Sequence, residues 1–329
     1  MTAIAPTLES WFTDRLGRQR QVSARTIASY RDTLKLLLRF MQDQTGKLPS
    51  NLDWDDLDHN AISAFLNYLE NDRGNSARTR NLRLTAIRSL FRYAALHHPE
   101  HAGVIQHVLA IPTKRFDKKL IGFLNAEESA ALIDAPNLQR WEGRRDRALL
   151  VLALQTGLRV SELINLDCAD IVLGAGGHVE CEGKGRRQRA VPLTGAAQQV
   201  LKVWMAERDG QAGDPLFPTR TGRRLSPDAV QRRVVLHATA AAQHCSSLQS
   251  KKLHPHILRH TCAMSLLHAG VDVAVIALWL GHADIRSTDA YIHADLTIKE
   301  RALALTTPAN VKPGRYEPAD PLMAMLESL

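Results

Sequence analysis

Six residues in the last two-thirds of the sequence could together bind and cleave a phosphodiester. They are two arginines, a lysine, two histidines and a tyrosine, in the order Arg159, Lys184, His256, Arg259, His282 and Tyr291. Cleavage places negative charge on the non-bridging oxygens of the transition state, and fixed positive groups can stabilise that charge. The arginine fork donates two parallel hydrogen bonds and stays charged at any working pH. We therefore expect Arg159 and Arg259 to hold these oxygens.

The lysine and the tyrosine of this set could supply a general acid and a nucleophile. Lys184 lies in the sequence Gly-Lys-Gly-Arg-Arg, which is predicted to form the tip of a hairpin and could bring an ammonium group to a leaving oxygen. Tyr291 follows His282 by nine residues, and its phenol needs an activated phosphorus and a proton acceptor to attack. Alone, such a lysine is usually solvated and such a tyrosine usually packs in a core. Their occurrence together with the arginines and histidines favours catalysis.

The histidine cluster has two interpretations. His256, Arg259 and His260 are spaced to share one face of a helix. The two histidines also have the spacing of a zinc-binding helix, but Ile257 stands where a metalloprotease carries glutamate, and no third ligand is evident. We expect no metal at this position. His260 is expected to be a buried, hydrogen-bonded side chain, and His256 to belong to the site.

Other motifs argue against a bound cofactor. Gly183 and Lys184 lack the earlier glycine of a phosphate-binding P-loop, and Gly185 replaces its serine or threonine. Residues 174–177 do not complete a dinucleotide-binding fingerprint. The four cysteines are widely spaced, which favours reduced thiols over a zinc ribbon or a disulfide framework. The sequence predicts neither cofactor nor metal.

Length and charge suggest two domains and a polyanionic partner. The chain has 329 residues and a formal net charge of +8, with a pI near 9.5. Nucleic acid is the commonest such partner, although solubility alone could explain this charge. The longest apolar run, residues 148–154, is too short to span a bilayer, and residues 1–16 do not resemble a secretory signal. We expect a cytoplasmic protein.

The first part of the chain, residues 6–109, has helical periodicity and no convincing strand. Ser23 and Ser76 are expected to cap helices, and a helix between them is expected to begin at about Asn60. The helix after Ser76 combines an apolar stripe with an arginine face that could contact a phosphate backbone or be solvated. The residues of that face are Arg78, Arg88 and Arg92.

A basic linker is expected between the two domains. Residues 1–111 form the first domain, and residues 112–122 contain a proline and a run of basic side chains with little periodicity. Within this linker, Lys114 and Arg115 could lie along DNA, although an exposed loop would have the same composition.

The second domain is expected to combine helices with a small antiparallel sheet, which makes the whole chain mainly α. Asn125 is expected to cap a helix, and Gly157 to end a buried helix over residues 145–156. Short strands are expected at residues 171–173, 178–182 and 189–193. Helices then continue to about Tyr291, with a loop over residues 237–252; prolines interrupt the tail before a short amphipathic segment, residues 322–329.

Three segments resemble the tyrosine recombinase (phage integrase-like) family, including its Xer-like and mobile-element members. Residues 254–293 resemble its histidine, arginine and tyrosine signature, residues 156–163 its first arginine box, and residues 182–193 its lysine hairpin. The resemblance implies a helical core-binding (SAM-like) domain over residues 1–111 and a catalytic domain over residues 123–295. It also implies that a helix in the tail, residues 296–329, could be exchanged between protomers.

The same resemblance implies a reaction. Tyr291 attacks the phosphate, which forms a 3′-phosphotyrosyl bond and frees a 5′-hydroxyl that Lys184 protonates. Arg159 and Arg259 hold the non-bridging oxygens. Because the covalent bond conserves the energy of the phosphodiester, neither ATP nor a metal is needed. Four protomers are expected to assemble on two double-stranded DNA sites and to exchange strands through a Holliday junction.

The remaining residues are expected to support this reaction. His256 assists proton transfer at the tyrosine, His282 donates a hydrogen bond to the phosphate, and Glu162 supports the fold beside the first arginine. Arg186 and Arg187, next to the lysine, are further candidates for DNA contacts.

Several functions share this chemistry. The favoured hypothesis is a site-specific recombinase that integrates, excises or transposes a mobile element. A Xer-like recombinase that resolves chromosome or plasmid dimers, a type IB topoisomerase and a non-catalytic DNA-binding accessory subunit are the alternatives. Cys262, where an aromatic residue is usual in the family, is a departure that affects packing more than chemistry.

Overall fold

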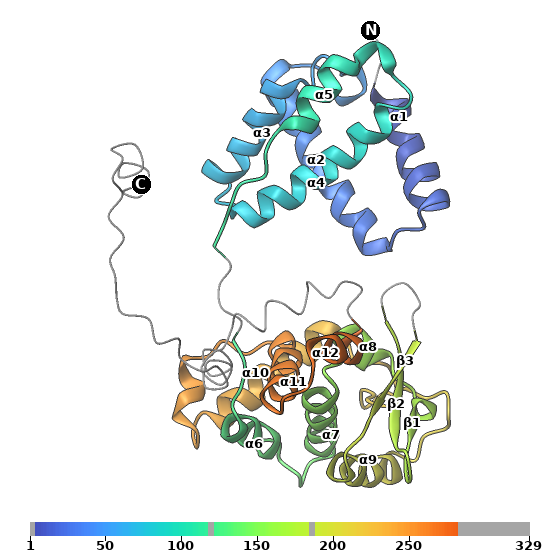
Figure 1. The fold of residues 1–329 in the computed structure, drawn as a ribbon, viewed down its shortest axis with the longest axis vertical. Helices are drawn as coiled ribbons and strands as arrows, with labels where there is room; N and C mark the ends of the chain where they lie inside the picture. Colours follow the sequence, from blue (N-terminus) through green and yellow to red (C-terminus); the bar gives the residue numbers. More distant parts are fainter. Residues whose placement is uncertain (1–3, 118–121, 184–187, 282–329) are drawn as a thin grey trace, which may run out of the picture. The chain divides into compact units, whose positions relative to one another are not determined.

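The structure is a computed structural model that describes residues 4–117, 122–183 and 188–281. The chain divides into two compact units, Met1–Lys118 and Lys119–Leu329 (Figure 1). They are called here the N-terminal unit and, after the domain that the resemblance implies for it, the catalytic unit. Each unit has a hydrophobic core of its own. The predicted mainly helical fold with one small antiparallel sheet is confirmed.

The N-terminal unit is helical, and residues 4–117 contain no strand. Its elements are α1 (Ile4–Ser10), η1 (Trp11–Gln19), α2 (Ala24–Thr45), η2 (Pro49–Asn51), α3 (His59–Asn71), α4 (Ala77–Ala94), η3 (Pro99–His101) and α5 (Ala102–Ala110). The predicted caps Ser23 and Ser76 are confirmed, since each side chain accepts a backbone N–H in the first turn. The helix expected to begin at about Asn60 begins at His59, and Asp58 caps it by accepting the N–H of Ala61.

The apolar stripe predicted on α4 forms part of this unit's core. Leu84, Ile87 and Phe91 are buried there against apolar residues of α2 and α3. In the same core, the rings of Trp11 and Tyr30 stack with centroids 5.6 Å apart. This burial leaves the polar face of α4 toward solvent.

The catalytic unit surrounds a buried helix, α7. Its elements are α6 (Ala126–Asp134), α7 (Trp141–Thr156), α8 (Val160–Asn165), η4 (Cys168–Asp170), β1 (Ile171–Val172), β2 (His178–Glu182), β3 (Gln188–Pro192), α9 (Gly195–Arg208), α10 (Pro227–Ala241), η5 (Ser246–Ser250), α11 (Pro255–His268) and α12 (Val273–Leu280). Figure 1 shows α7 inside the unit, where it contacts α6, α9 and α11. The strands pair antiparallel in the order β1-β2-β3, and Cys181 lies opposite Arg189.

Local signals place most of these elements correctly. Asn125 and Glu128 form a capping box at the start of α6. Gly157 ends α7 with φ +64°, and a Cβ there would lie 2.6 Å from Cδ2 of Leu280, so this junction requires glycine. The loop expected over residues 237–252 is partly wrong: residues 237–241 belong to α10, because His237 is buried and hydrogen-bonds Asp146 of α7 at 2.9 Å.

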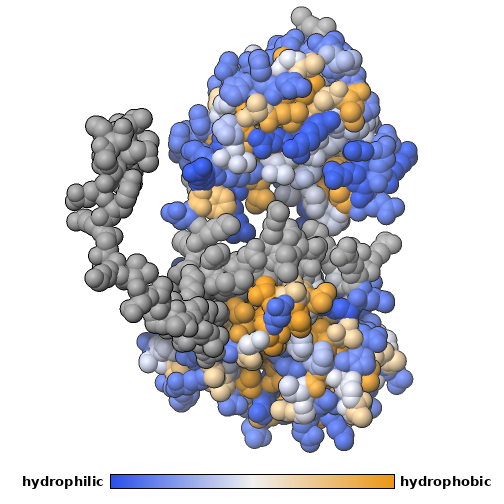
Figure 2. Space-filling view, in the orientation of Figure 1, coloured by the Kyte–Doolittle hydropathy of each residue, from blue (hydrophilic) through white to orange (hydrophobic). Residues whose placement is uncertain are grey.

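The surface of the catalytic unit includes exposed apolar side chains. On the face that Figure 2 shows, they gather near α11 and α12, and Leu278 of α12 is 76% exposed. Within the described part of the chain, no helix is both long and apolar enough to cross a membrane. All four cysteines are free and buried, which agrees with the expected reduced thiols.

Candidate active site

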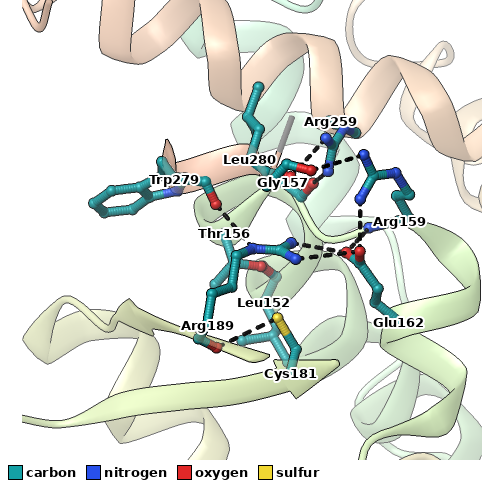
Figure 3. A network of polar contacts seen from close by, with 11 residues as sticks. Leu152, Thr156, Gly157, Arg159, Glu162, Cys181, Arg189, Arg259, Trp279 and Leu280 are labelled. Carbon is teal, nitrogen blue, oxygen red and sulfur yellow. Dashed lines mark hydrogen bonds and ion pairs between the residues drawn. The ribbon is translucent and has the colours of Figure 1, made fainter. Parts of the chain in front are cut away.

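Two predicted arginines meet where the helices α7, α8, α11 and α12 come together (Figure 3). Arg259 projects from α11 and is 5% exposed. Its Nη1 donates to the carbonyl of Gly157 at 2.7 Å, and its Nη2 donates to the carbonyl of Leu280 at 2.7 Å. The guanidinium thus satisfies carbonyls at the ends of α7 and α12, where a positive charge is also favoured by the helix dipoles. These contacts fix the direction of the side chain.

Arg159 lies beside it at the start of α8. Its Nη2 donates to the carbonyl of Gly281 at 3.1 Å, the residue directly after the carbonyl that Arg259 binds. Its Nη1 donates to Oε1 of Glu162 at 2.7 Å, and its backbone N–H donates to Oε2 of the same carboxylate at 2.8 Å. The Arg159 side chain remains 29% exposed. The structure therefore brings the two arginines together and leaves one of them accessible.

Glu162 is the anionic centre of this arrangement. Its side chain is 3% exposed, and it binds Arg159 and a second arginine, Arg189. Burial by itself raises the pKa of the Glu162 carboxyl, but hydrogen bonds from Arg189 and from Arg159 outweigh burial and hold its pKa below the usual value. The carboxylate is thus ionised, and the support expected of Glu162 consists of contacts to both arginines.

Arg189 was not among the residues selected from the sequence. It lies on β3, where the burial pattern turns Arg189 and Val191 inward and the residues between and beside them outward. The Glu162 carboxylate raises the pKa of the Arg189 guanidinium, against the opposing effect of burial. The alternation of the strand could have shown that this arginine points into the unit, but not which partner it meets.

The histidine pair lies at the start of α11. His256 is exposed, and the ring centroids of His256 and His260 lie 6.5 Å apart. Burial, and then the charges of His256, His254 and Arg259, lower the pKa of His260 to about 4. His260 is therefore neutral near pH 7. Among the described residues, no group of three or more histidine, cysteine or acidic side chains could hold a metal ion.

Five of the predicted residues and the predicted tail lie outside the described residues. The tail is 296–329, and the residues are Lys184, Arg186, Arg187, His282 and Tyr291. Residues next to them in the sequence lie close to the arginines. Gly281, directly before His282, accepts a hydrogen bond from Arg159, and Arg189 of β3 lies five residues after Lys184.

The DNA-contact candidates of the N-terminal unit fall into two groups. Arg78, Arg92 and Arg115 are exposed. Arg88 is half-buried and donates to the carbonyl of Ile111, and Lys114, although it is also exposed, binds Glu70 at 2.9 Å. These last two side chains therefore have partners within the unit.

Comparison with known proteins places these observations in a family. The chain matches the Phage integrase family over residues 122–297 and the Phage integrase N-terminal SAM-like domain over residues 10–98. It is 49% identical over 329 residues to y4rC of Sinorhizobium fredii, named as an integrase/recombinase, which covers 99% of this chain and 98% of that protein. Tyrosine recombinase XerC of Pseudomonas aeruginosa is 35% identical over 290 residues, which covers 86% of this chain and 89% of XerC.

A solved structure has the same fold. The XerH site-specific recombinase, bound to the palindromic difH substrate in a post-cleavage complex, superposes with a TM-score of 0.70 at 23% identity, covering 87% of this chain and 81% of that one. The sequence matches extend over both units, and the arginine box and the lysine hairpin lie within the longer of the two family matches. The chain belongs to the phage integrase family of tyrosine recombinases, which cleave and rejoin DNA strands.

Proposed function

We propose that this recombinase acts at a specific DNA site to integrate, excise or transpose a mobile element. The observation that carries the proposal is the convergence of Arg159 and Arg259 on the consecutive carbonyls of Leu280 and Gly281, directly before His282. A phosphate bound there would meet two guanidinium groups whose positions the backbone already fixes. The likeness to y4rC over nearly the whole chain supports the mobile-element role, and the likeness to XerC makes dimer resolution the second candidate.

The proposed reaction uses the residues of this chain alone. The Tyr291 oxygen forms a bond to phosphorus as the bond to the 5′-oxygen breaks, and the leaving oxygen takes a proton from Lys184. His256 receives the phenol proton, and His282 hydrogen-bonds the phosphate. Arg159 and Arg259 stabilise the added charge on the non-bridging oxygens. The 5′-hydroxyl of a second strand reverses these steps and releases Tyr291.

The proposed partner is double-stranded DNA, bound by four protomers on paired sites. Exposed Arg78 and Arg92 support a contact of α4 with the phosphate backbone. The exposed apolar residues of α12 support a contact with the tail of a neighbouring protomer. Because its substrate is DNA, we expect the protein to work in the cytoplasm.

Covalent trapping tests this function. Nicked duplexes taken from the DNA flanking the gene are incubated with the protein in EDTA and without ATP, and adducts are resolved on SDS gels. We expect an SDS-stable protein–DNA adduct that Tyr291→Phe does not form. Salt-sensitive binding without an adduct would favour an accessory subunit, and an adduct that persists in Tyr291→Phe would refute the proposed nucleophile.

A further inference from the structure

Arg189, which the sequence motifs did not indicate, makes polar contacts with all three of its side-chain nitrogens in the candidate site. Its Nη2 donates to Oε2 of Glu162 at 2.8 Å, and its Nη1 donates to Oε1 at 3.2 Å, so the pair is bidentate. Its Nε donates to the carbonyl of Trp279 at 3.1 Å. The side chain is 12% exposed. Every one of its N–H-bearing nitrogens therefore has a partner, close to Arg159 and Arg259 (Figure 3).

These contacts join three elements that lie close in sequence to predicted catalytic residues. Arg189 lies on β3, which returns from the loop that holds Lys184, and it reaches α8 through Glu162 and α12 through Trp279. It also lies directly beneath the turn before His282: a Cβ added to Gly281 would lie 2.8 Å from Nη1 of Arg189. The positive φ of +64° favours glycine at that turn, and a Cβ there would also press on the guanidinium.

The charge balance gives this arrangement a chemical consequence. One carboxylate, Glu162, binds two guanidinium groups, those of Arg159 and Arg189. With both arginines present, the three side chains carry a net positive charge that can act on a phosphate. Without Arg189, the Glu162 carboxylate would neutralise Arg159 alone, and it would also lose the bidentate contact that fixes its direction. Removing one partner of a buried ion pair leaves the remaining charge less compensated.

We propose that Arg189 is a positioning residue for DNA cleavage: through Glu162 it orients Arg159 and keeps the positive charge of Arg159 available to the scissile phosphate. The proposal rests on the proposed function. The effect of Arg189 must pass through Arg159 and the charge of the phosphate. It need not pass through Lys184, although Lys184 lies only five residues before Arg189 in the sequence.

Single-turnover cleavage of two nicked duplexes tests this proposal. One carries the natural phosphodiester, and the other carries a methylphosphonate at the scissile position, in which a methyl group replaces a charged oxygen. On the phosphodiester we expect Arg189→Gln to slow cleavage by about 10- to 100-fold, with DNA affinity within about twofold of wild type. On the neutral methylphosphonate, both Arg189→Gln and Arg159→Ala should lose most of their defect. Arg189→Lys keeps the charge without the bidentate fork and should fall between wild type and Arg189→Gln.

A matched control separates positioning from general support of α8. Arg224 donates to the carbonyl of Asn165 at 2.7 Å and to Asp167 at 2.6 Å, so it holds the opposite end of the same helix. Arg224→Gln should lower the melting temperature and leave the ratio of the two cleavage rates unchanged.

The outcomes distinguish the two proposals. If Arg189→Gln cleaves the phosphodiester at the wild-type rate, or shows an equal defect on both duplexes, the role of Arg189 is overturned and the proposed function stays intact. Absence of cleavage by the wild-type protein on both duplexes would overturn the proposed function and this inference with it. If Arg189→Gln fails to fold, Arg189→Lys carries the comparison, because its defect must shrink on the methylphosphonate in the same way.

Discussion

In the N-terminal unit, the arginines expected to meet DNA stand on the exposed face of α4, as Arg78 and Arg92 do. In the catalytic unit, Arg259 is 5% exposed and binds two backbone carbonyls, and Arg159 binds a carbonyl and a buried carboxylate. Exposed arginines give binding that salt can screen and that tolerates movement. Buried and partnered arginines give fixed directions, which transition-state stabilisation requires. Burial and partners, rather than charge alone, therefore separate a binding arginine from a candidate catalytic one.

The largest effect should come from Arg259→Ala. The buried carbonyls of Gly157 and Leu280 would lose their donors, so we expect a loss of about 2–4 kcal/mol in the free energy of unfolding. Cleavage should fall by at least about 100-fold. Urea unfolding and covalent adduct formation measure the two effects. The matched variant Arg78→Ala should change the stability by less than about 0.5 kcal/mol, and equal stability losses in the two variants would break the comparison.

How much of this arrangement follows from the sequence depends on the distance between partners along the chain. The caps Ser23, Ser76 and Asn125 were predictable, because each acts on N–H groups only three residues away. The strands were predictable to within one residue from their alternation and glycine turns. The pairing of Arg189 with Glu162 joins residues 27 positions apart, and that of Arg259 with Gly157 joins residues 102 positions apart. Such partners are chosen by tertiary packing, which local patterns do not encode.

The N-terminal unit shows the same limit. Arg78, Arg88 and Arg92 have the spacing of one face, yet Arg88 turns to the carbonyl of Ile111 at the end of α5. Lys114, placed in the predicted linker, has its backbone bonded to the Asn81 side chain of α4 at 2.8 and 3.0 Å. Helical spacing determines which residues are neighbours, whereas the return of a distant segment determines which of them are exposed.

Replacing Glu162 tests whether the catalytic unit needs a fixed anion between its arginines. Glu162→Gln should reduce the melting temperature at pH 7, because two guanidinium groups lose a charged acceptor. The folded-state pKa of Glu162 lies below its ordinary value of 4.5. Its carboxylate therefore stabilises the fold above that pH, and the contribution is lost as the pH falls through the folded-state pKa. Melting curves from pH 7 to pH 3 should show the two proteins converging at the acidic end, and a constant difference would contradict this account.

Exposed arginines of α4 should act on binding alone. For Arg78→Gln and Arg92→Gln we expect severalfold weaker DNA binding and a salt dependence whose slope falls by about 1 for each removed contact. The melting temperature should not change. Titrations at several salt concentrations measure the slope. Arg88→Gln serves as the contrasting variant on the same helix, since it should lower stability by removing the contact to Ile111. A salt slope unchanged in all three variants would remove α4 from the DNA interface.

The smallest effect concerns His260, a histidine near Arg259 that burial keeps neutral. Its pKa falls from an ordinary value of 6.5 to about 4 in the folded protein. An unfolded chain therefore binds a proton at this residue more readily than the folded chain does between these values. Protonation of His260 therefore does not affect the stability of the fold above pH 6.5, and it lowers the free energy of unfolding progressively as the pH falls toward 4. Compared with wild type, His260→Gln should lose less melting temperature over this interval, by a few degrees. Identical acid sensitivity would show that His260 tolerates a proton beside Arg259, and that burial alone does not exclude a second charge from the site.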